Sequence, residues 1–300
     1  YAYIKAQRRL FPTGLGTGRV APVKVGHLAA YDKKNKEGYV VVWERRKDTS
    51  GQRRYYLLHW DLGSNRIRAA YSLGTRTSAH RWFSIKPIGY DPASKEVFLQ
   101  RVIKLRSPQG KRAYSVSVIA AKRGRGRVVK TFYTQRKLSP GPFYDAKNKR
   151  AFLVEYAEKA DATPAPWGYL VDLQKGKVKK LRIPLTSYAV SFSSDGKWLY
   201  VFSAQTGWIW KVNTKSGRRR RRRKVGTLGH TMGYIRGDTL LLLKNYGLMF
   251  LDPKTLRKLQ YIRAKKLPKS LPYYHGVLVS KDHFIVDHRR ILYLFKINTK

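Results

Sequence analysis

The chain of 300 residues has no cysteine and only 2 methionines. The absence of cysteine excludes disulfide bonds, thiolate metal sites and cysteine nucleophiles. Long apolar runs are also missing, since none approaches the roughly 18 consecutive apolar residues that a membrane-spanning helix needs. The sequence therefore predicts that this is not an integral membrane protein.

Acidic residues are scarce as well. The chain has 17 Asp and Glu against 64 Lys and Arg, which gives a formal net charge of +47. Like charges in this excess oppose a compact fold, so they indicate a neutralising partner or a special environment. The partner classes that fit are nucleic acid, anionic polysaccharide or lipopolysaccharide, and an acidic protein surface. The same shortage disfavours a carboxylate-rich calcium or magnesium site.

Helical periodicity is almost absent too. What the chain does contain is 42% hydrophobic and 13% aromatic residues, enough for a packed core. They fall in short strands separated by polar turns, which is typical of an all-β sandwich, barrel or propeller. Two apolar strands joined by a polar turn recur six times, at the spacing of about 40–55 residues that four-stranded propeller blades show. The six instances span residues 28–43, 86–100, 140–156, 188–202, 232–243 and 276–287.

One of these repeats carries a resemblance to a known family. The segment SFSSDGKWLYVFSAQTGWIWKVNTKSG (191–217) is similar to the repeat of bacterial YVTN-type and WD40-like β-propellers, in which S-x-DG-K-x-LYV precedes G-x-I and a later threonine. The resemblance implies a propeller fold. It implies nothing about chemistry, because propellers include enzymes, scaffolds and binding proteins.

We predict an all-β fold, a six-bladed β-propeller of four-stranded blades forming a single domain over residues 1–300. The last repeat has only three strands, so the strand-like N-terminal residues 1–12 are expected to close the sixth blade and remove its free edge. Seven blades, or six without this closure, are the alternatives. The predicted blades span residues 26–75, 79–134, 137–186, 187–227, 228–265 and 266–300 plus 1–12.

The first residue is Tyr1 rather than Met. This indicates a processed or trimmed chain, and a removed signal peptide would also fit the missing cysteines. A secreted protein in a periplasmic or extracellular location is therefore the favoured expectation.

Lysine and arginine gather in the predicted turns, most densely in SGRRRRRRKVG (216–226). This run lies inside a blade and continues into its outermost strand, where alternate side chains should face opposite sides. Arginine suits phosphate or sulfate because its planar fork binds such groups in a bidentate way. We therefore predict non-enzymatic binding of a polyanion with little sequence specificity, first nucleic acid and second an anionic cell-surface polysaccharide. The predicted binding residues are Arg123, Arg125, Arg127, Lys175, Lys177, Lys179, Lys180, Lys215, Arg218, Arg219, Arg220, Arg221, Arg222, Arg223, Lys224, Lys254 and Arg257.

Other interpretations of the charge stay open. The turns could simply be solvated, the surface could be adapted to an acidic medium, or the arginine run could be a nuclear-localisation signal. The protein could also be a structural subunit of a surface or extracellular assembly that pairs with an acidic partner. Aromatic side chains such as Trp208 and Trp210 are expected mostly between blades, although some near basic turns could stack on bases or sugars.

The alternative in which the protein is an enzyme rests on three histidines. Apart from a metal ion that these could bind, no cofactor is expected. His27, His230 and His275 precede the first strands of three neighbouring predicted blades. They could bind a divalent metal with an open position, or one could act as a general base in a lyase or hydrolase with Tyr273 or Tyr274 nearby. The simpler interpretation is that they cap loops. His59 shows no such alignment.

Overall fold

The computed structural model describes residues 24–45, 52–77, 82–105, 113–138, 143–155, 167–182, 189–203, 206–226, 233–236, 239–244, 247–263, 275–278, 283–288 and 291–296. In these residues the chain forms 23 strands and no helix. The all-β prediction is confirmed.

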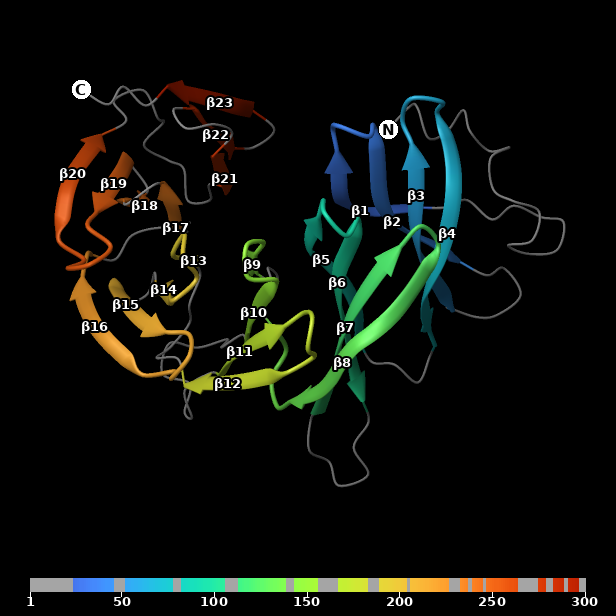
Figure 1. The fold of residues 1–300 in the computed structure, drawn as a ribbon, viewed down its shortest axis with the longest axis horizontal. Helices are drawn as coiled ribbons and strands as arrows, with labels where there is room; N and C mark the ends of the chain where they lie inside the picture. The colour runs from blue at the N-terminus through green and yellow to red at the C-terminus, as the bar shows by residue number, and fades with distance from the viewer. Residues whose placement is uncertain are drawn as a thin grey trace, which may run out of the picture. The chain divides into compact units, whose positions relative to one another are not determined.

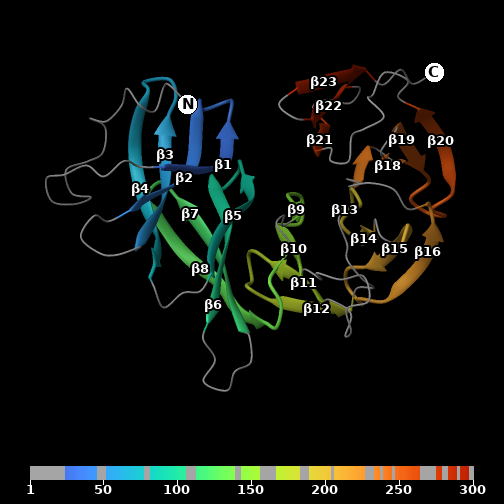
Figure 2. The same cartoon turned by 180° about the vertical axis from the view of Figure 1, so that it is seen from behind.

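The strands form six sheets, each made of consecutive antiparallel strands (Figures 1 and 2). The first sheet contains β1 (Lys24–Asp32), β2 (Glu37–Arg45), β3 (Arg53–Asp61) and β4 (Arg66–Arg76), and the second contains β5 (Trp82–Asp91), β6 (Glu96–Leu105), β7 (Ala113–Lys122) and β8 (Arg125–Thr134). The third contains β9 (Phe143–Asp145), β10 (Arg150–Val154), β11 (Trp167–Asp172) and β12 (Val178–Arg182), and the fourth contains β13 (Ala189–Phe192), β14 (Trp198–Phe202), β15 (Trp208–Asn213) and β16 (Arg219–Lys224). The fifth contains β17 (Gly233–Arg236), β18 (Thr239–Lys244), β19 (Gly247–Leu251) and β20 (Lys258–Arg263), and the sixth contains β21 (His275–Leu278), β22 (His283–His288) and β23 (Ile291–Lys296).

These sheets follow the predicted repeats closely. Each one begins and ends within or beside one predicted blade range, and the sixth has three described strands. Residues 1–12, which were expected to add the missing strand, lie outside the described residues, so closure by them stays a prediction. The chain also divides into two compact units, residues 1–155 with 171–179 and residues 156–170 with 180–300. That all six blades form a single domain likewise stays a prediction.

The core of the first unit lies between the first two sheets. Tyr39 and Leu57 of the first sheet pack with Ile85 and Leu99 of the second, and all four side chains are buried. Val41, two residues after Tyr39, and Val97, two residues before Leu99, belong to the same core, because every second side chain of a strand points to the same face. One face of each of these strands thus contributes to this core.

The core of the second unit is built in the same way from the fourth and fifth sheets. Tyr200 and Phe202 pack against Leu240 and Leu242. The hydroxyl of Tyr200 also donates a 3.0 Å hydrogen bond to the backbone carbonyl of Pro253, in the turn after β19. This packing holds the turn after β19 beside the fourth sheet.

The scarce carboxylates stand mainly where strands end. Asp61, at the end of β3, accepts hydrogen bonds from the backbone N–H groups of Gly63 at 2.9 Å and Ser64 at 3.2 Å. Such side-chain turns are a preferred use of aspartate. Five other strand-ending aspartates accept backbone N–H groups in the same manner, namely Asp32, Asp91, Asp145, Asp172 and Asp252. Much of the small acidic complement therefore serves turn geometry.

In the first and fourth sheets the turns after the first and third strands lie together. The backbone N–H of Leu62, after β3, donates to the carbonyl of Lys36, after β1, at 2.8 Å, and Thr214 donates to Lys197 at 3.0 Å in the fourth sheet. The lysines and arginines of the two turns are thereby gathered at one end of the strands.

Candidate functional site

The arginine run forms β16, the outermost strand of the fourth sheet. All six side chains of β16 are exposed. No ion pair joins any of them to a carboxylate within the described part of the chain. Arg222 lies over the ring of Trp208, 4.9 Å from its centroid, which is a cation–π contact with a neighbouring strand.

A β-bulge interrupts this strand at Arg220. Lys211 of β15 pairs with Arg221 and Val212 pairs with Arg219, so Arg220 has no partner in the register. A bulge re-aims side chains, because two residues of one strand then oppose one residue of the other. The expectation of simple alternation along the arginine run is wrong at this point, since the adjacent Arg220 and Arg221 line the same cleft.

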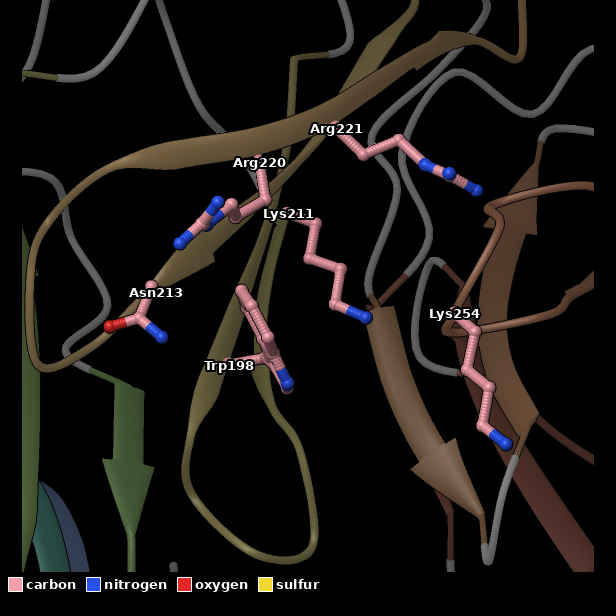
Figure 3. A pocket seen from close by; sticks show the side chains of 6 residues that line it. All are labelled: Trp198, Lys211, Asn213, Arg220, Arg221 and Lys254. Atoms are coloured by element: carbon pink, nitrogen blue, oxygen red, sulfur yellow. The ribbon is translucent and has the colours of Figure 1, made fainter.

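That cleft is open, has a volume of about 560 Å³ and lies within the second unit. Figure 3 shows Lys211 in the middle above Trp198, Asn213 and Arg220 on one side, and Arg221 and Lys254 on the other. Four of the six lining side chains are cationic and none is acidic. Sequence reasoning had named Arg220, Arg221 and Lys254 but missed the other three, Trp198, Lys211 and Asn213.

Lys211 is the unusual member of this group. Its side chain is buried, with 9% of the residue exposed, although it carries an ammonium group. Its Nζ donates a 2.9 Å hydrogen bond to the carbonyl of Pro253 and lies 4.4 Å from the ring centroid of Trp198. Burial, together with the charge of Arg221, lowers the pKa of this ammonium. No carboxylate pairs with it among the described residues.

Asn213 and Trp198 occupy directly paired positions on β15 and β14. The Oδ1 atom of Asn213 accepts hydrogen bonds from the backbone N–H of Ser216 at 2.8 Å and from its hydroxyl at 3.1 Å. The amide nitrogen is thereby left for another acceptor, and it lies on the side of Trp198 (Figure 3). Trp198 is half-buried, with its apolar part packed against the core of the second unit.

The predicted basic residues of the first unit are placed differently. Arg123 has an Nη2 atom 3.8 Å from Oε1 of Glu37, and Arg127 has one 3.4 Å from Oε1 of Glu96. These two arginines are therefore partly neutralised by the protein itself. Arg125 is exposed.

The remaining predicted residues lie in turns, apart from Lys179 and Lys180 on β12. Lys180 is exposed and has its Nζ 4.1 Å from the ring centroid of Trp167. Lys179 is half-buried. The turn residues are all exposed, namely Lys175, Lys177, Lys215, Arg218 and Arg257, so they are accessible to a ligand.

The histidine site cannot be assembled from the described side chains. His230 lies outside the described residues, and the side chains of His27 on β1 and His275 on β21 lie outside them too. Within the described residues, no group of three His, Asp or Glu side chains is arranged to hold a metal ion. The catalytic or metal role of these three histidines stays a prediction.

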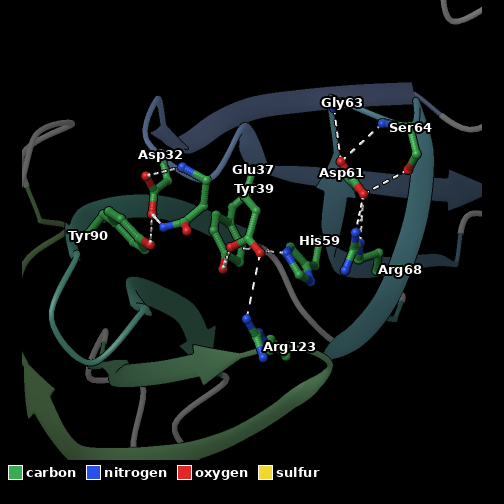
Figure 4. A network of polar contacts seen from close by, with 11 residues as sticks. Asp32, Glu37, Tyr39, His59, Asp61, Gly63, Ser64, Arg68, Tyr90 and Arg123 are labelled. Atoms are coloured by element: carbon green, nitrogen blue, oxygen red, sulfur yellow. Dashed lines mark hydrogen bonds and ion pairs between the residues drawn. The ribbon is translucent and has the colours of Figure 1, made fainter.

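His59, which the alignment of repeats had set aside, lies in a buried polar network (Figure 4). Its ring stacks on Tyr39 at 4.9 Å, and its Nε2 lies 3.4 Å from Oε2 of Glu37. Burial lowers the pKa of the imidazole, against the opposing charge of Glu37. The sequence does contain a signal for the burial of His59. It lies two residues after Leu57, a core residue, and therefore on the same face of β3. Only 3% of His59 is exposed, so this network supports the fold rather than offering a site.

Comparisons with known proteins establish the fold. No family model and no curated protein matches the chain. The β-propeller domain of Cps50 (Swd1) from Myceliophteria thermophila is 11% identical, with a TM-score of 0.54, over 92% of this chain and 86% of that one. A provisionally assigned 6-phosphogluconolactonase from Bacteroides uniformis ATCC 8492 is 12% identical, with a TM-score of 0.54, over 88% and 79% of the two chains.

The protein has a β-propeller fold with sheets as its blades, as the repeat resemblance implied. At these identities the likeness is one of fold alone, and the fold serves enzymes and binding proteins alike. The described residues contain no helix able to cross a membrane.

Proposed function

We propose that this protein binds a polyanion, with nucleic acid as the first candidate, through β16 and the adjoining cleft. The observation that carries the proposal is a cleft lined by four cations and no carboxylate, beside a strand whose side chains are all exposed and basic. Positive potential that the protein does not neutralise raises the local concentration of anions and speeds their association. No catalytic step is required.

Binding of this kind needs little sequence recognition. Arginine forks hold phosphate oxygens in a bidentate way, and contacts to the backbone of a nucleic acid carry no sequence information. Each neutralised phosphate releases counterions, so affinity must fall steeply with salt. We therefore expect broad specificity and strong dependence on ionic strength.

Two simpler roles explain fewer of the features of β16 and the cleft. Charged side chains on an outermost strand discourage edge-to-edge pairing with another chain, which would explain an exposed arginine in β16. That role gives no reason for the burial of Lys211, whose ammonium has a backbone carbonyl but no carboxylate as partner among the described residues. Pairing with an acidic protein in an assembly would use the same surface, and it predicts stoichiometric protein rather than nucleic acid on purification.

The test compares two variants with equal loss of charge. One changes Arg218–Arg223 to Ser; the control changes six exposed basic residues of the first unit to Ser, namely Lys33, Lys34, Arg66, Lys122, Lys130 and Lys147. Fluorescence anisotropy with a labelled single strand, a duplex and a sulfated polysaccharide gives affinity against salt concentration. Wild-type affinity should fall roughly a thousandfold between about 50 and 200 mM salt if six or more phosphates are contacted.

The β16 variant should bind more weakly than the control variant at every salt concentration and show a shallower salt slope. Equal losses in the two variants would mean that total charge, rather than this surface, drives binding. Salt-insensitive binding, or no binding of any polyanion, would overturn the proposal.

A further inference from the structure

Resting on the proposed function, we propose that the cleft at Lys211 is a subsite for single-stranded nucleic acid, in which one base lies beside Trp198 between two bound phosphates. The subsite comprises Trp198, Lys211, Asn213, Arg220, Arg221 and Lys254.

The buried ammonium of Lys211 is the first argument. Charged side chains are almost never fully buried without a partner, because an uncompensated charge loses its hydration on burial. Lys211 has a backbone carbonyl and an indole ring beside it, but no carboxylate among the described residues. An anionic ligand would supply the missing counter-charge.

The arrangement of the other cations is the second argument. Arg220 lies on one side of Lys211, and Arg221 and Lys254 lie on the other (Figure 3). Cations at both ends of an open cleft suit an extended ligand with repeated charges better than a single small ion. The backbone of a nucleic acid strand has that character.

Trp198 and Asn213 supply the third argument. They stand in the same cleft as the cations, and the amide nitrogen of Asn213 is left to donate to a carbonyl or ring nitrogen. A basic groove that also contains an aromatic ring is the usual arrangement for binding single strands, because every base has a face that can stack. Phosphates against the four cations, Lys211 included, and a base beside Trp198 and Asn213 would use the whole lining.

Other polyanions would use only part of this lining. A duplex keeps its bases stacked inside, so it would present phosphates to the arginines and leave Trp198 and Asn213 without partners. A sulfated polysaccharide would satisfy the cations, but it offers neither a flat aromatic face to the indole nor a planar polar edge to the amide. The single strand is therefore the favoured occupant.

The experiment separates bases from phosphates. A labelled thymidine oligonucleotide and an abasic oligonucleotide of the same length carry the same charge, and each is titrated against the full chain by anisotropy. We expect the abasic strand to bind roughly tenfold more weakly, the scale of one stacked base. Trp198→Leu should bring this ratio near one. Trp198→Phe, which keeps an aromatic face, should preserve most of it.

Each outcome decides one of the two proposals. Tight, salt-dependent binding with equal affinities for thymidine and abasic strands would overturn the subsite and leave polyanion binding standing. Tighter binding of sulfated polysaccharide than of a thymidine strand of equal charge would overturn it in favour of that ligand. No salt-dependent binding of any polyanion would overturn both proposals. Should Trp198→Leu fail to fold, the wild-type ratio and Trp198→Phe decide.

Discussion

The first and fourth sheets place different residues at equivalent positions. In the first sheet, Glu37 pairs with Asp61 and Tyr39 pairs with His59 across β2 and β3. In the fourth sheet, the same positions of β14 and β15 hold Trp198 opposite Asn213 and Tyr200 opposite Lys211. Both hairpins that follow carry a bulge, at Arg68 and at Arg220. Of these two sheets, only the first has acidic residues at these positions.

In the first sheet, the acidic side chains at these positions form ion pairs within the protein. Nε of Arg68 donates to Oδ2 of Asp61 at 2.9 Å, and Arg123 from the next sheet reaches Glu37. Hydrogen bonds from Ser64 and Arg68 hold the pKa of Asp61 well below its usual range. Figure 4 shows both groups of contacts, one around Asp61 and one around Glu37.

At the positions compared, the fourth sheet keeps the cations and lacks the acids. Asn213 replaces the turn aspartate without losing the turn, because its Oδ1 accepts the same kind of backbone hydrogen bond. Among the described residues Arg220 has no carboxylate partner, and Lys254 from the next sheet lines the cleft where Arg123 meets Glu37 in the first. One repeat thus neutralises its own cations, whereas the other leaves them without a carboxylate partner among the described residues.

Giving the fourth sheet the acids of the first should have the largest effect. Trp198→Glu combined with Asn213→Asp supplies two carboxylates to Arg220, Lys211 and Lys254. Loss of about two phosphate contacts should weaken binding to a single strand on the order of a hundredfold near 0.1 M salt. Anisotropy measures the loss, and thermal melting checks that the variant folds.

The single change Asn213→Asp is nearly isosteric and should cost about tenfold by the same reasoning. Its control is Gln174→Glu, which adds the same charge at an exposed turn of the third sheet. Equal effects of the two single variants would show that position is irrelevant and would break the comparison between the sheets.

Replacing Lys211 should separate binding from stability. Lys211→Met removes a buried cation and fills a similar volume, so we expect affinity to fall about tenfold while the free energy of unfolding rises by about 1 kcal/mol. Denaturant unfolding and anisotropy on the same preparation give both values. The control is Lys254→Met, an exposed position where affinity should fall without a gain in stability. A destabilised Lys211→Met protein would mean that the bond to Pro253 matters more than desolvation.

The sequence predicted the sheets well because their signals are local. Short apolar runs between polar turns mark buried strands, as in the segment WLYVF (198–202) of β14, in which the last four residues are all buried, and the strand-ending Asp and Asn mark turns. The pairing of neighbouring turns follows from a four-stranded meander. These features need no knowledge of distant contacts.

The cleft could not be predicted in the same way. A run of identical arginines carries no alternation, so the sequence gives no sign of where its register shifts, and the bulge at Arg220 was invisible. Lys211 did leave a signal, a charge within the apolar segment WIWKVN, at a position paired with the buried Tyr200. The predicted binding residues, which come from basic turns and the arginine run, do not include it.

The smallest expected effect concerns pH and the first sheet. His59 is buried with its pKa lowered below the ordinary value of about 6.5. The unfolded chain therefore binds more protons than the folded one as the pH falls below this value. The contribution of His59 to stability is present above about pH 6.5 and is lost as the pH falls toward the lower folded pKa.

We expect the melting temperature to fall by on the order of a few degrees between pH 7.5 and pH 5.5, and His59→Gln to flatten that dependence. The turn carboxylate of Asp32 does not interfere, because hydrogen bonds from Asn35 and Tyr90 hold its pKa at about 2, so it stays ionised throughout. Tyr39→Phe is the control, since it removes the hydroxyl that donates to Glu37 but keeps the ring stacked on His59. If His59→Gln kept the wild-type pH dependence while Tyr39→Phe lost it, the titrating group would not be this imidazole. The pH dependence of the melting temperature would then come from another titratable side chain of the first sheet.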